Sequence, residues 1–161
     1  MEKAVFFDRD GVINKEIGDY VFELEKFELN ESVVVVMREA IEKDYKLFVV
    51  TNQSGIAKGV YGHENVDKIH RHMTKILREK GIQLAEIYYC PHHPDYSNCL
   101  CRKPGSLMLE KAVARYGLDV SKCIMVGDRD RDIESADRIG IKGVRIESNA
   151  PLEALLPLLV E

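Results

Sequence analysis

Short apolar runs rich in β-branched and aromatic residues alternate along the chain with amphipathic stretches. The apolar runs have the length of buried strands, with candidates at Ala4–Phe7, Leu47–Val50, Ile87–Tyr89, Ile124–Val126 and Gly143–Ile146. Apolar residues at helical spacing predict helices at Val33–Lys43, Val66–Lys80, Leu107–Tyr116 and Ile133–Ile139. Because strands that alternate with helices favour right-handed βαβ units, we expect an α/β fold with a Rossmann-like parallel sheet and helices on both faces.

Glycine and proline mark the ends of several predicted elements. Gly81, Gly117 and Gly140 follow three of the helices, where a residue in the left-handed conformation often caps the carboxyl end. The last segment, Pro151–Val160, has the pattern of a short amphipathic helix that Pro157 would end early.

The composition is that of an ordinary globular protein, with 45% hydrophobic and 31% charged residues. The chain of 161 residues has the size of one domain and no internal repeat or linker, so we expect a single domain over residues 1–161. No apolar run could span a bilayer, and the run at Ala4–Phe7 begins too close to Met1 to leave room for a signal peptide. We therefore expect a soluble, cytoplasmic protein with no membrane partner. A monomer is a separate expectation, which no feature of the sequence carries.

The charge of the chain bears on its partners. A formal net charge of −4, without a block of Lys or Arg, argues against a surface built for a nucleic-acid backbone. A pocket for a small anion needs only a few cations, so small anionic ligands stay compatible with this charge. We expect no nucleic acid among the partners.

Polar residues follow three of the predicted strands. Asp8-Arg9-Asp10 comes after the first strand, Thr51-Asn52-Gln53-Ser54-Gly55 after the second and Gly127-Asp128 after the fourth. In a parallel sheet the carboxyl ends of the strands meet at one edge, and ligands bind outside that edge. A functional site is therefore expected where these segments come together.

Asp8 and Asp10 can point the same way because they flank Arg9, and Gly11 permits a sharp turn behind them. Two unit charges about 4 Å apart repel by roughly 4 kcal/mol at an effective dielectric constant of about 20, and Asp128 adds a third negative charge. Such a cluster calls for a cation, and hard oxygen ligands suit Mg²⁺. A bare D-x-D, however, is more often a pair of solvated turn residues.

The companions of this pair favour a site over a solvated turn. Thr51 and Asn52 offer hydroxyl and amide donors at the neighbouring strand end, and Lys103 can supply a positive charge. Asp128 and Asp132 form a G-D-x-x-x-D pair. Together these residues indicate a magnesium site that can receive a phosphate.

Three of the four cysteines lie close together beside a histidine. The spacings C-x-H and C-x-C can close a tetrahedral zinc site whose ligands would be Cys90, His92, Cys99 and Cys101. Because the protein fills all positions, the zinc would be structural and would pin a loop that ends at Arg102 and Lys103. Reduced free thiols and a disulfide between Cys90 and Cys99 are the alternatives, and a reducing cytosol favours the metal over the disulfide.

Four motifs occur in order and cover nearly the whole chain: F-F-D-R-D-G-V-I-N at residues 6–14, V-V-T-N-Q at 49–53, R-K-P at 102–104 and M-V-G-D-R-D-R-D at 125–132. In these motifs the sequence resembles the haloacid dehalogenase superfamily of phosphotransferases. The resemblance implies a phosphatase that uses Mg²⁺ and a phosphoaspartate intermediate. Asp8 would be the nucleophile, and Asp10 the general acid and then base, with its backbone carbonyl as a magnesium ligand.

The same resemblance implies roles for the later motifs. Thr51 would donate a hydrogen bond to the phosphoryl group, and Lys103 would balance charge. Asp128 would bind Mg²⁺ together with Asp8. Asp132 would support that metal site or orient Lys103.

The cysteine motif immediately before R-K-P, with T-N-Q-S-G-I-A-K-G at residues 51–59, resembles the subfamily of heptose 1,7-bisphosphate and histidinol-phosphate phosphatases. T-N-Q-S-G-I-A-K-G and D-Y-V at residues 19–21 are more similar to the heptose branch. The short segment between His92 and Cys99 is more similar to the histidinol branch. The resemblance therefore implies a small phosphorylated metabolite as substrate: a D-glycero-D-manno-heptose 1,7-bisphosphate that loses its 7-phosphate, with histidinol phosphate as the alternative.

No cap domain lies between the motifs, so short elements must bound the pocket: the loop near Gly18–Val21, the Gln53–Gly59 loop and the zinc loop. A second phosphate on the substrate would meet Arg102 or Arg129 there. The implied substrate-binding residues are Arg9, Gly18, Asp19, Tyr20, Asn52, Gln53, Ser54, Arg102 and Arg129.

Three other classes of protein share part of this pattern. A phospho-receiver domain also combines acids, a Thr and a Lys on a parallel sheet, but its phosphorylated Asp follows the third strand, whereas D-x-D here follows the first. A zinc-stabilised binding module would need only the Cys₃His cluster. A nucleic-acid 3′-phosphatase shares T-N-Q-like motifs, and the acidic balance counts against it.

Overall fold

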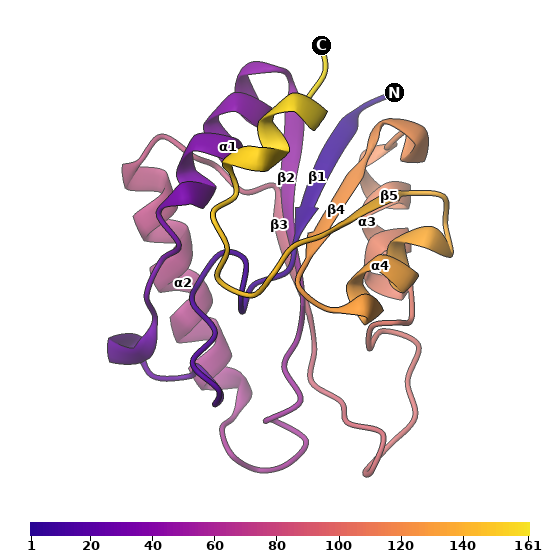
Figure 1. Ribbon diagram of the computed structural model, residues 1–161. Coiled ribbons are helices and arrows are strands. Elements are labelled where there is room, and N and C mark those ends of the chain that lie inside the picture. Colours follow the sequence, from indigo (N-terminus) through magenta and orange to yellow (C-terminus); the bar gives the residue numbers. More distant parts are fainter.

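The computed structural model describes residues 1–161 and is built around a five-stranded sheet (Figure 1). The strands are β1 (Lys3–Phe7), β2 (Tyr45–Asn52), β3 (Glu86–Cys90), β4 (Ile124–Gly127) and β5 (Lys142–Arg145). Their order is β3-β2-β1-β4-β5, which places β1 in the middle. Every pair of neighbours is parallel, so the predicted Rossmann-like sheet is confirmed.

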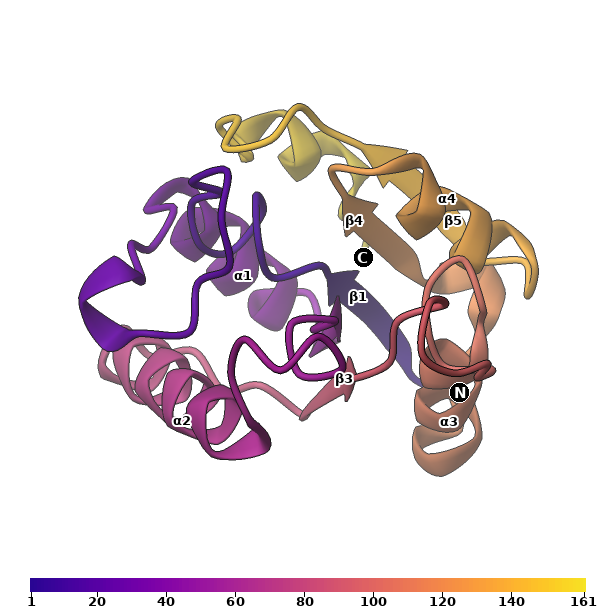
Figure 2. The ribbon, with the colours of Figure 1, turned by 90° about the horizontal axis from the view of Figure 1, so that it is seen from below.

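Helices cover both faces of the sheet, with α1 and α2 on one side and α3 and α4 on the other (Figure 2). They are α1 (Ser32–Glu42), α2 (His63–Glu79), α3 (Leu107–Tyr116) and α4 (Asp130–Asp137). Side chains of β1 alternate between the two cores: Val5 and Phe7 pack in the core under α1 and α2, whereas Ala4 and Phe6 pack in the core under α3 and α4. Because both faces are buried, this strand is a continuous apolar run.

Three elements differ most from the predicted ones, and α2 is one of them, because it begins at His63 instead of Val66. α4 begins at Asp130, earlier than predicted, because the side chain of Asp132 accepts a hydrogen bond of 3.0 Å from the backbone N–H of Arg129 and caps the first turn. The last segment is a 3₁₀ helix, η3 (Glu153–Leu158), rather than an α-helix. Pro157 lies inside it and has no N–H with which to continue an α-helical ladder.

The predicted glycine caps are confirmed. Gly117 ends α3 with a φ of 62°, and its backbone N–H donates to the carbonyl of Val113. Gly81 and Gly140 have φ values of 79° and 80°. The turn after Gly117 leads to a short 3₁₀ helix, η2 (Val120–Lys122), just before β4.

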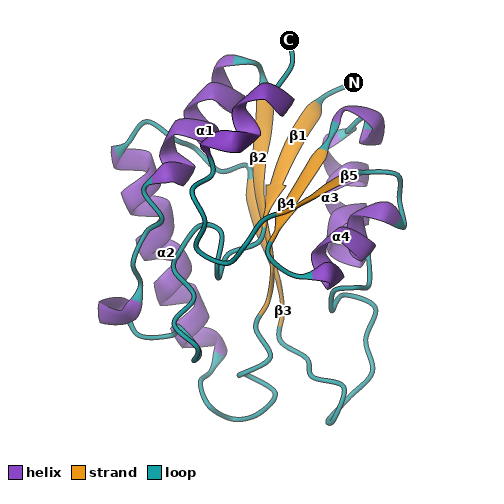
Figure 3. Ribbon diagram, in the orientation of Figure 1, coloured by secondary structure: helices purple, strands orange, loops and turns teal.

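Long loops leave the carboxyl ends of β1, β2 and β3 (Figure 3). They span residues 8–31, 53–62 and 91–106, and the only helix in them is the 3₁₀ helix η1 (Leu24–Lys26). No cap domain is inserted, as predicted, so these loops alone bound the edge of the sheet that carries the polar motifs. None of the helices combines the length and the apolar surface needed to cross a membrane.

Candidate active site

Three buried carboxylates meet at the carboxyl ends of β1 and β4. Asp8 follows β1, Asp128 follows β4, and Asp132 lies in the first turn of α4. Each offers an oxygen within 4.8 Å of the others, and the residues are only 7%, 3% and 0% exposed. The predicted acidic cluster is therefore present and is shielded from bulk water.

Lys103 lies inside this cluster. Its Nζ is 2.9 Å from Asp8 Oδ1 and 2.6 Å from Asp132 Oδ1, and it donates to the carbonyl of Val50 at 2.8 Å. Burial acts to lower the pKa of Lys103, but the two carboxylates outweigh it and raise that pKa, so the ammonium keeps its proton. The lysine thus balances one of the negative charges.

Asn52, at the end of β2, holds the backbone of Lys103. Its Oδ1 accepts from the N–H of Lys103 at 3.0 Å, and its Nδ2 donates to the carbonyl of Lys103 at 3.2 Å. These two bonds join β2 to the loop that follows β3. Sequence reasoning expected Asn52 only as a substrate ligand and missed this positioning contact.

The charge that Lys103 leaves uncompensated fits a divalent cation. Burial raises the pKa of Asp8 to about 7, and Asp132 and Asp128 add to this effect while Lys103 opposes it. One oxygen of Asp128, Oδ1, is buried without a hydrogen-bond partner, and the other accepts from Ser148 at 2.5 Å. A buried carboxylate oxygen without a partner is costly, and a hard cation would satisfy it.

Gly11 allows the chain to turn close against this cluster. Its φ is 86°, and a Cβ built on it would lie 2.8 Å from Cγ of Asp128 and still closer to a carboxylate oxygen. Any other residue would therefore displace Asp128, and the sharp turn predicted after Asp10 requires glycine.

Asp10 is held by three donors. Its Oδ1 accepts from Arg9 at 2.8 Å and from Asn14 at 2.9 Å, and its Oδ2 accepts from Gln53 at 3.1 Å. Burial acts to raise the pKa of Asp10, but the Arg9 guanidinium and these hydrogen bonds lower it overall. The free protein therefore holds Asp10 as a carboxylate, in the form that can accept a proton.

Arg9 lies beneath the site rather than on its surface. Its side chain is fully buried, and the guanidinium donates to Asp10 and, at 2.9 Å, to the carbonyl of Val21. Nε2 of His70 lies 3.3 Å from the same guanidinium, and burial together with Arg9 lowers the pKa of His70 to about 3. Arg9 is a predicted substrate-binding residue; in the structure it contacts Asp10, Val21 and His70 and does not line the small cavity described below.

A small cavity of about 110 Å³ opens directly over the carboxylates. Its walls are formed by Asp8, Asp10, Glu16, Asp19, Tyr20, Val21, Asn52, Gln53, Ser54, Asp128, Arg129 and Arg131. Of the expected substrate-binding residues, Arg9, Gly18 and Arg102 are absent from this wall. Glu16 and Arg131 are present although sequence reasoning did not select them. Thr51 is 1% exposed, and its Oγ1 accepts from Gln53 at 3.0 Å.

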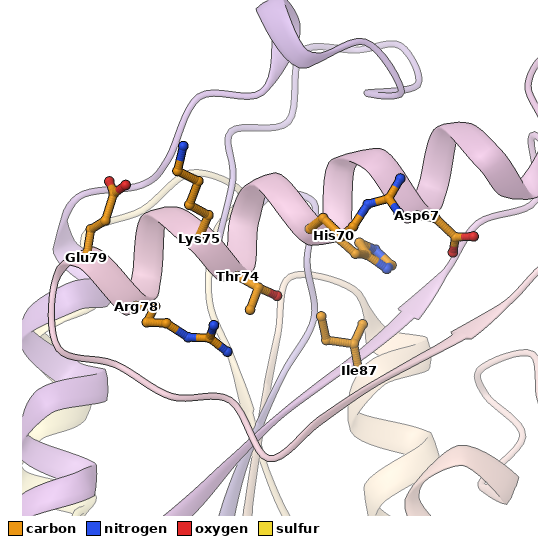
Figure 4. A pocket seen from close by; sticks show the side chains of 8 residues that line it. Asp67, His70, Thr74, Lys75, Arg78, Glu79 and Ile87 are labelled. Atoms are coloured by element: carbon orange, nitrogen blue, oxygen red, sulfur yellow. The ribbon is translucent and has the colours of Figure 1, made fainter.

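The largest cavity, about 780 Å³, lies elsewhere, between α2 and the edge strand β3 (Figure 4). Figure 4 shows Thr74, Lys75 and Arg78 of α2 and Ile87 of β3 along its wall. None of the clustered carboxylates reaches it. The small polar cavity over Asp8 is therefore the candidate active site, because it alone combines a space with the clustered carboxylates.

Comparison with known proteins agrees with this geometry. Residues 100–156 match the family model described as HAD-hydrolase-like. A D-glycero-alpha-D-manno-heptose-1,7-bisphosphate 7-phosphatase of Photorhabdus laumondii is 37% identical over 145 residues, 86% of this chain and 79% of the relative. A D-glycero-beta-D-manno-heptose-1,7-bisphosphate 7-phosphatase of Haemophilus influenzae is 40% identical over 147 residues, 88% of this chain and 78% of the relative.

This chain belongs to the heptose-bisphosphate phosphatase family of the haloacid dehalogenase superfamily. The crystal structure of the D,D-heptose 1,7-bisphosphate phosphatase of B. bronchiseptica, complexed with magnesium and phosphate, superposes with a TM-score of 0.82. The two proteins are 30% identical, and the match covers 89% of this chain and 79% of that one. The resemblance read from the four motifs is therefore confirmed.

The phosphatase also brings together the four residues of the predicted zinc cluster. Cys90 Sγ lies 3.3 Å from His92 Nδ1, 3.7 Å from Cys99 Sγ and 3.0 Å from Cys101 Sγ, and all four candidate ligand atoms lie within 4.8 Å of one another. All cysteines are free, so the disulfide alternative is absent. A tetrahedral ion with Zn–S bonds of about 2.3 Å fits donor atoms at these separations.

Arg102 follows the cysteine cluster and does not line the small cavity. Its backbone N–H donates to Cys99 Sγ at 3.4 Å, and its guanidinium donates to the carbonyl of His92 at 3.3 Å. Burial and the nearby charge of Arg131 lower the pKa of Arg102, so the two cations lie within electrostatic reach of each other. The cluster thus fixes the backbone that immediately precedes Lys103.

Proposed function

We propose that this protein is a Mg²⁺-dependent phosphomonoester hydrolase that works through a phosphoaspartate and removes the 7-phosphate of D-glycero-D-manno-heptose 1,7-bisphosphate. The observation that carries the proposal is the small cavity lined by Asp8, Asp10 and Asp128, where the buried Lys103 ammonium lies 2.9 Å from Asp8 and the acidic cluster suits Mg²⁺. The names of the relatives supply the substrate class.

In the proposed mechanism Asp8 is the nucleophile. Lys103 contacts its Oδ1 at 2.9 Å and lowers the repulsion between this carboxylate and a phosphate dianion. Bound Mg²⁺, held by Asp8, Asp128 and the backbone carbonyl of Asp10, would supply further charge neutralisation at the phosphate. Asp132 orients Lys103, since its oxygens already contact the lysine ammonium and the N–H of Arg129.

Proton transfer falls to Asp10 in both halves of the reaction. Asp10, a carboxylate in the free protein, first takes up a proton from solvent as the substrate binds; when Asp8 attacks phosphorus, the bond to the sugar oxygen breaks and Asp10 gives this proton to that oxygen. In the second half, the Asp10 carboxylate takes a proton from a water molecule that attacks the phosphoaspartate and releases Asp8 and phosphate. Thr51 would donate its hydroxyl proton to the transferred phosphoryl group.

The walls of the cavity suit a charged sugar. Glu16 and Asp19 offer acceptors for hydroxyl groups, and Arg129 and Arg131 offer donors for a second phosphate. Arg102 would add charge at longer range. Histidinol phosphate carries an amine and has no second phosphate, so this distribution of cations favours a bisphosphate.

The substrate assignment is tested by comparing kcat/KM for the heptose 1,7-bisphosphate and for histidinol phosphate. One or two charge-assisted hydrogen bonds to the second phosphate should favour the bisphosphate by about 10- to 10³-fold. Arg131→Ala should lose much of this preference, whereas Arg115→Ala, which removes an exposed arginine on α3, should keep it. Equal or higher kcat/KM for histidinol phosphate would contradict the assignment and leave the mechanism standing.

Magnesium is expected to stabilise the protein more strongly as the pH rises. Without metal, burial raises the pKa of Asp8 from 3.8 to about 7. A group whose pKa is raised by folding contributes stability that is present below its unfolded pKa and is lost as the pH rises through its folded pKa. Mg²⁺ binds the carboxylate, so its stabilising effect should grow between about pH 4 and pH 7.

The measurement is the melting temperature with and without added Mg²⁺ across this range. We expect a small difference near about pH 5 and a larger one near about pH 8. Asp8→Asn should remove most of the pH dependence, since asparagine does not titrate. An equal rise in melting temperature on addition of Mg²⁺ at both ends of the pH range would rule out Asp8 as the titrating ligand.

A structural Zn²⁺ on the cysteine cluster is the second metal that we propose. Cys99→Ser should reduce bound zinc from about one ion per chain to almost none and lower the free energy of unfolding by more than about 2 kcal/mol. Cys123→Ser is the matched control, because this buried thiol lies outside the cluster. Elemental analysis and urea unfolding check both values, and an unchanged zinc content in the Cys99 variant would overturn the assignment.

The remaining features of the proposal concern the setting of the reaction. We propose that residues 1–161 form one catalytic domain whose partner is a small phosphorylated metabolite. Action as a monomer, in the cytoplasm and without nucleic acid, stays a prediction of the sequence.

A further inference from the structure

Tyr61 contacts the proposed proton-transfer residue through one intermediate side chain. Its hydroxyl donates to Oε1 of Gln53 at 2.7 Å. The amide nitrogen of Gln53 then donates to Asp10 Oδ2 at 3.1 Å and to Thr51 Oγ1 at 3.0 Å. Tyr61 and Gln53 are 8% and 3% exposed, so water competes little for these bonds.

The direction of these bonds determines which way the amide of Gln53 faces. The Asp10 carboxylate can only accept, so the amide nitrogen of Gln53 faces Asp10 and Thr51, and the Tyr61 hydroxyl donates to Oε1 and holds the amide in this orientation. The reverse orientation would place an amide oxygen against the Asp10 carboxylate. Burial raises the pKa of Tyr61, so the hydroxyl keeps the proton that it donates.

The ring of Tyr61 is itself held in place from several sides. It stacks on Phe22 with ring centres 5.1 Å apart and meets Tyr20 edge-on at 5.6 Å. A Cβ built on Gly55 would collide with the ring, so the glycine of T-N-Q-S-G is what lets the tyrosine approach. The hydroxyl therefore occupies a defined point behind Gln53.

We propose that Tyr61 is a positioning residue that holds the Asp10 carboxyl for proton transfer by fixing the orientation of the Gln53 amide. This inference rests on the proposed role of Asp10 as general acid and base. In this role Gln53 positions Asp10, in addition to any contact with the substrate. A glycine is required at position 55 because a side chain there would collide with the Tyr61 ring.

If Tyr61 has this role, the loss of kcat/KM in a Tyr61 variant should depend on the leaving group of the substrate. Tyr61→Phe keeps the ring but removes the donor, so the Gln53 amide loses the bond that anchors it and its hydrogen bond to Asp10 becomes less well defined. Loss of alignment should lower kcat/KM for a sugar phosphate, whose alkoxide leaves only with a proton, by about 10- to 100-fold. The kcat/KM for p-nitrophenyl phosphate should stay within about twofold, because nitrophenolate leaves without protonation and this constant reports only the first half of the reaction.

The experiment measures both constants for the metal-loaded protein and for three variants. Tyr61→Phe should show the split, and Gln53→Met, which removes the amide, should lower kcat/KM for the sugar phosphate by a similar factor. The double variant should lose no more than either single one, because both act on the same hydrogen-bonded unit. Tyr88→Phe is the matched control, since its hydroxyl donates to Glu86 and Tyr88 does not line the small cavity.

Equal losses for both substrates would mean a general structural role and would overturn the inference, as would no loss for either. If Tyr61→Phe fails to fold, the kcat/KM of Gln53→Met for the sugar phosphate decides, and a value within about twofold of the wild type would overturn the inference. Asp10→Asn is measured in parallel. Normal hydrolysis of the sugar phosphate by that variant would refute the role of Asp10 itself. This result would distinguish failure of the proposed function from failure of the positioning role of Tyr61.

Discussion

Asp8→Asn should lower turnover by about four to six orders of magnitude while the protein stays folded. The amide cannot attack phosphorus as a carboxylate does, and it is a poorer ligand for Mg²⁺. The size of asparagine matches that of aspartate, and Lys103 can still donate to the amide oxygen where it now meets Asp8 Oδ1 at 2.9 Å. The loss should therefore appear in kcat rather than in the melting temperature.

Steady-state kinetics and circular dichroism check this expectation. Asp67→Asn is the matched control, because it changes an exposed aspartate on α2 that lies outside the small cavity. In the wild-type protein, beryllium fluoride should form an adduct on Asp8 that mass spectrometry or crystallography can locate. Turnover by a folded Asp8→Asn protein at the wild-type rate would remove Asp8 from the role of nucleophile.

Lys103→Met is expected to damage both stability and activity. The lysine side chain is 2% exposed, and removal of its charge leaves Asp8 and Asp132 close together in a site shielded from water. Breaking a buried ion pair in this way costs about 3–5 kcal/mol, although protonation of Asp8 or bound Mg²⁺ would offset part of that loss. Loss of a cation beside the transferred phosphoryl group should lower kcat by about 10³-fold or more.

Urea unfolding and kinetics, both at saturating Mg²⁺, measure the two effects. Lys103→Arg should not restore activity, because the larger fork cannot keep the contact to the carbonyl of Val50 in a filled site. Lys111→Met, at an exposed position of α3, is the control for loss of a positive charge. Wild-type stability and kcat in the Lys103 variant would show that the buried lysine is dispensable.

The sheet and its helices were predictable because periodicity reports burial. Ala4–Phe7 is apolar at every position because β1 is covered on both faces. Gly117, directly after Tyr116, correctly predicted the end of α3. The start of α4 was missed because its first turn consists of charged residues. Asp132 caps that turn from within the helix, and hydrophobic periodicity carries no signal for such a cap.

The site was predictable as a set of residues, but not in the direction of each side chain. Arg9 lies between two aspartates, and nothing local shows that its guanidinium turns inward to the carbonyl of Val21 and to His70. Those partners are distant in sequence, so only the assembled fold determines the orientation. Sequence patterns did not identify Tyr61 for the same reason. The four residues of the cysteine cluster, in contrast, lie close together in the sequence, so their spacing was enough to predict the cluster.

The central place of β1 affects how the protein can form on the ribosome. β1 pairs with β2 on one side, but its other neighbour, β4, is synthesised more than a hundred residues later, at Ile124–Gly127. A nascent chain that ends before β4 exposes an unpaired strand edge at the middle of the future sheet. Asp8 likewise stays without Asp128 until that moment, so a truncated chain is expected to be both inactive and prone to aggregate.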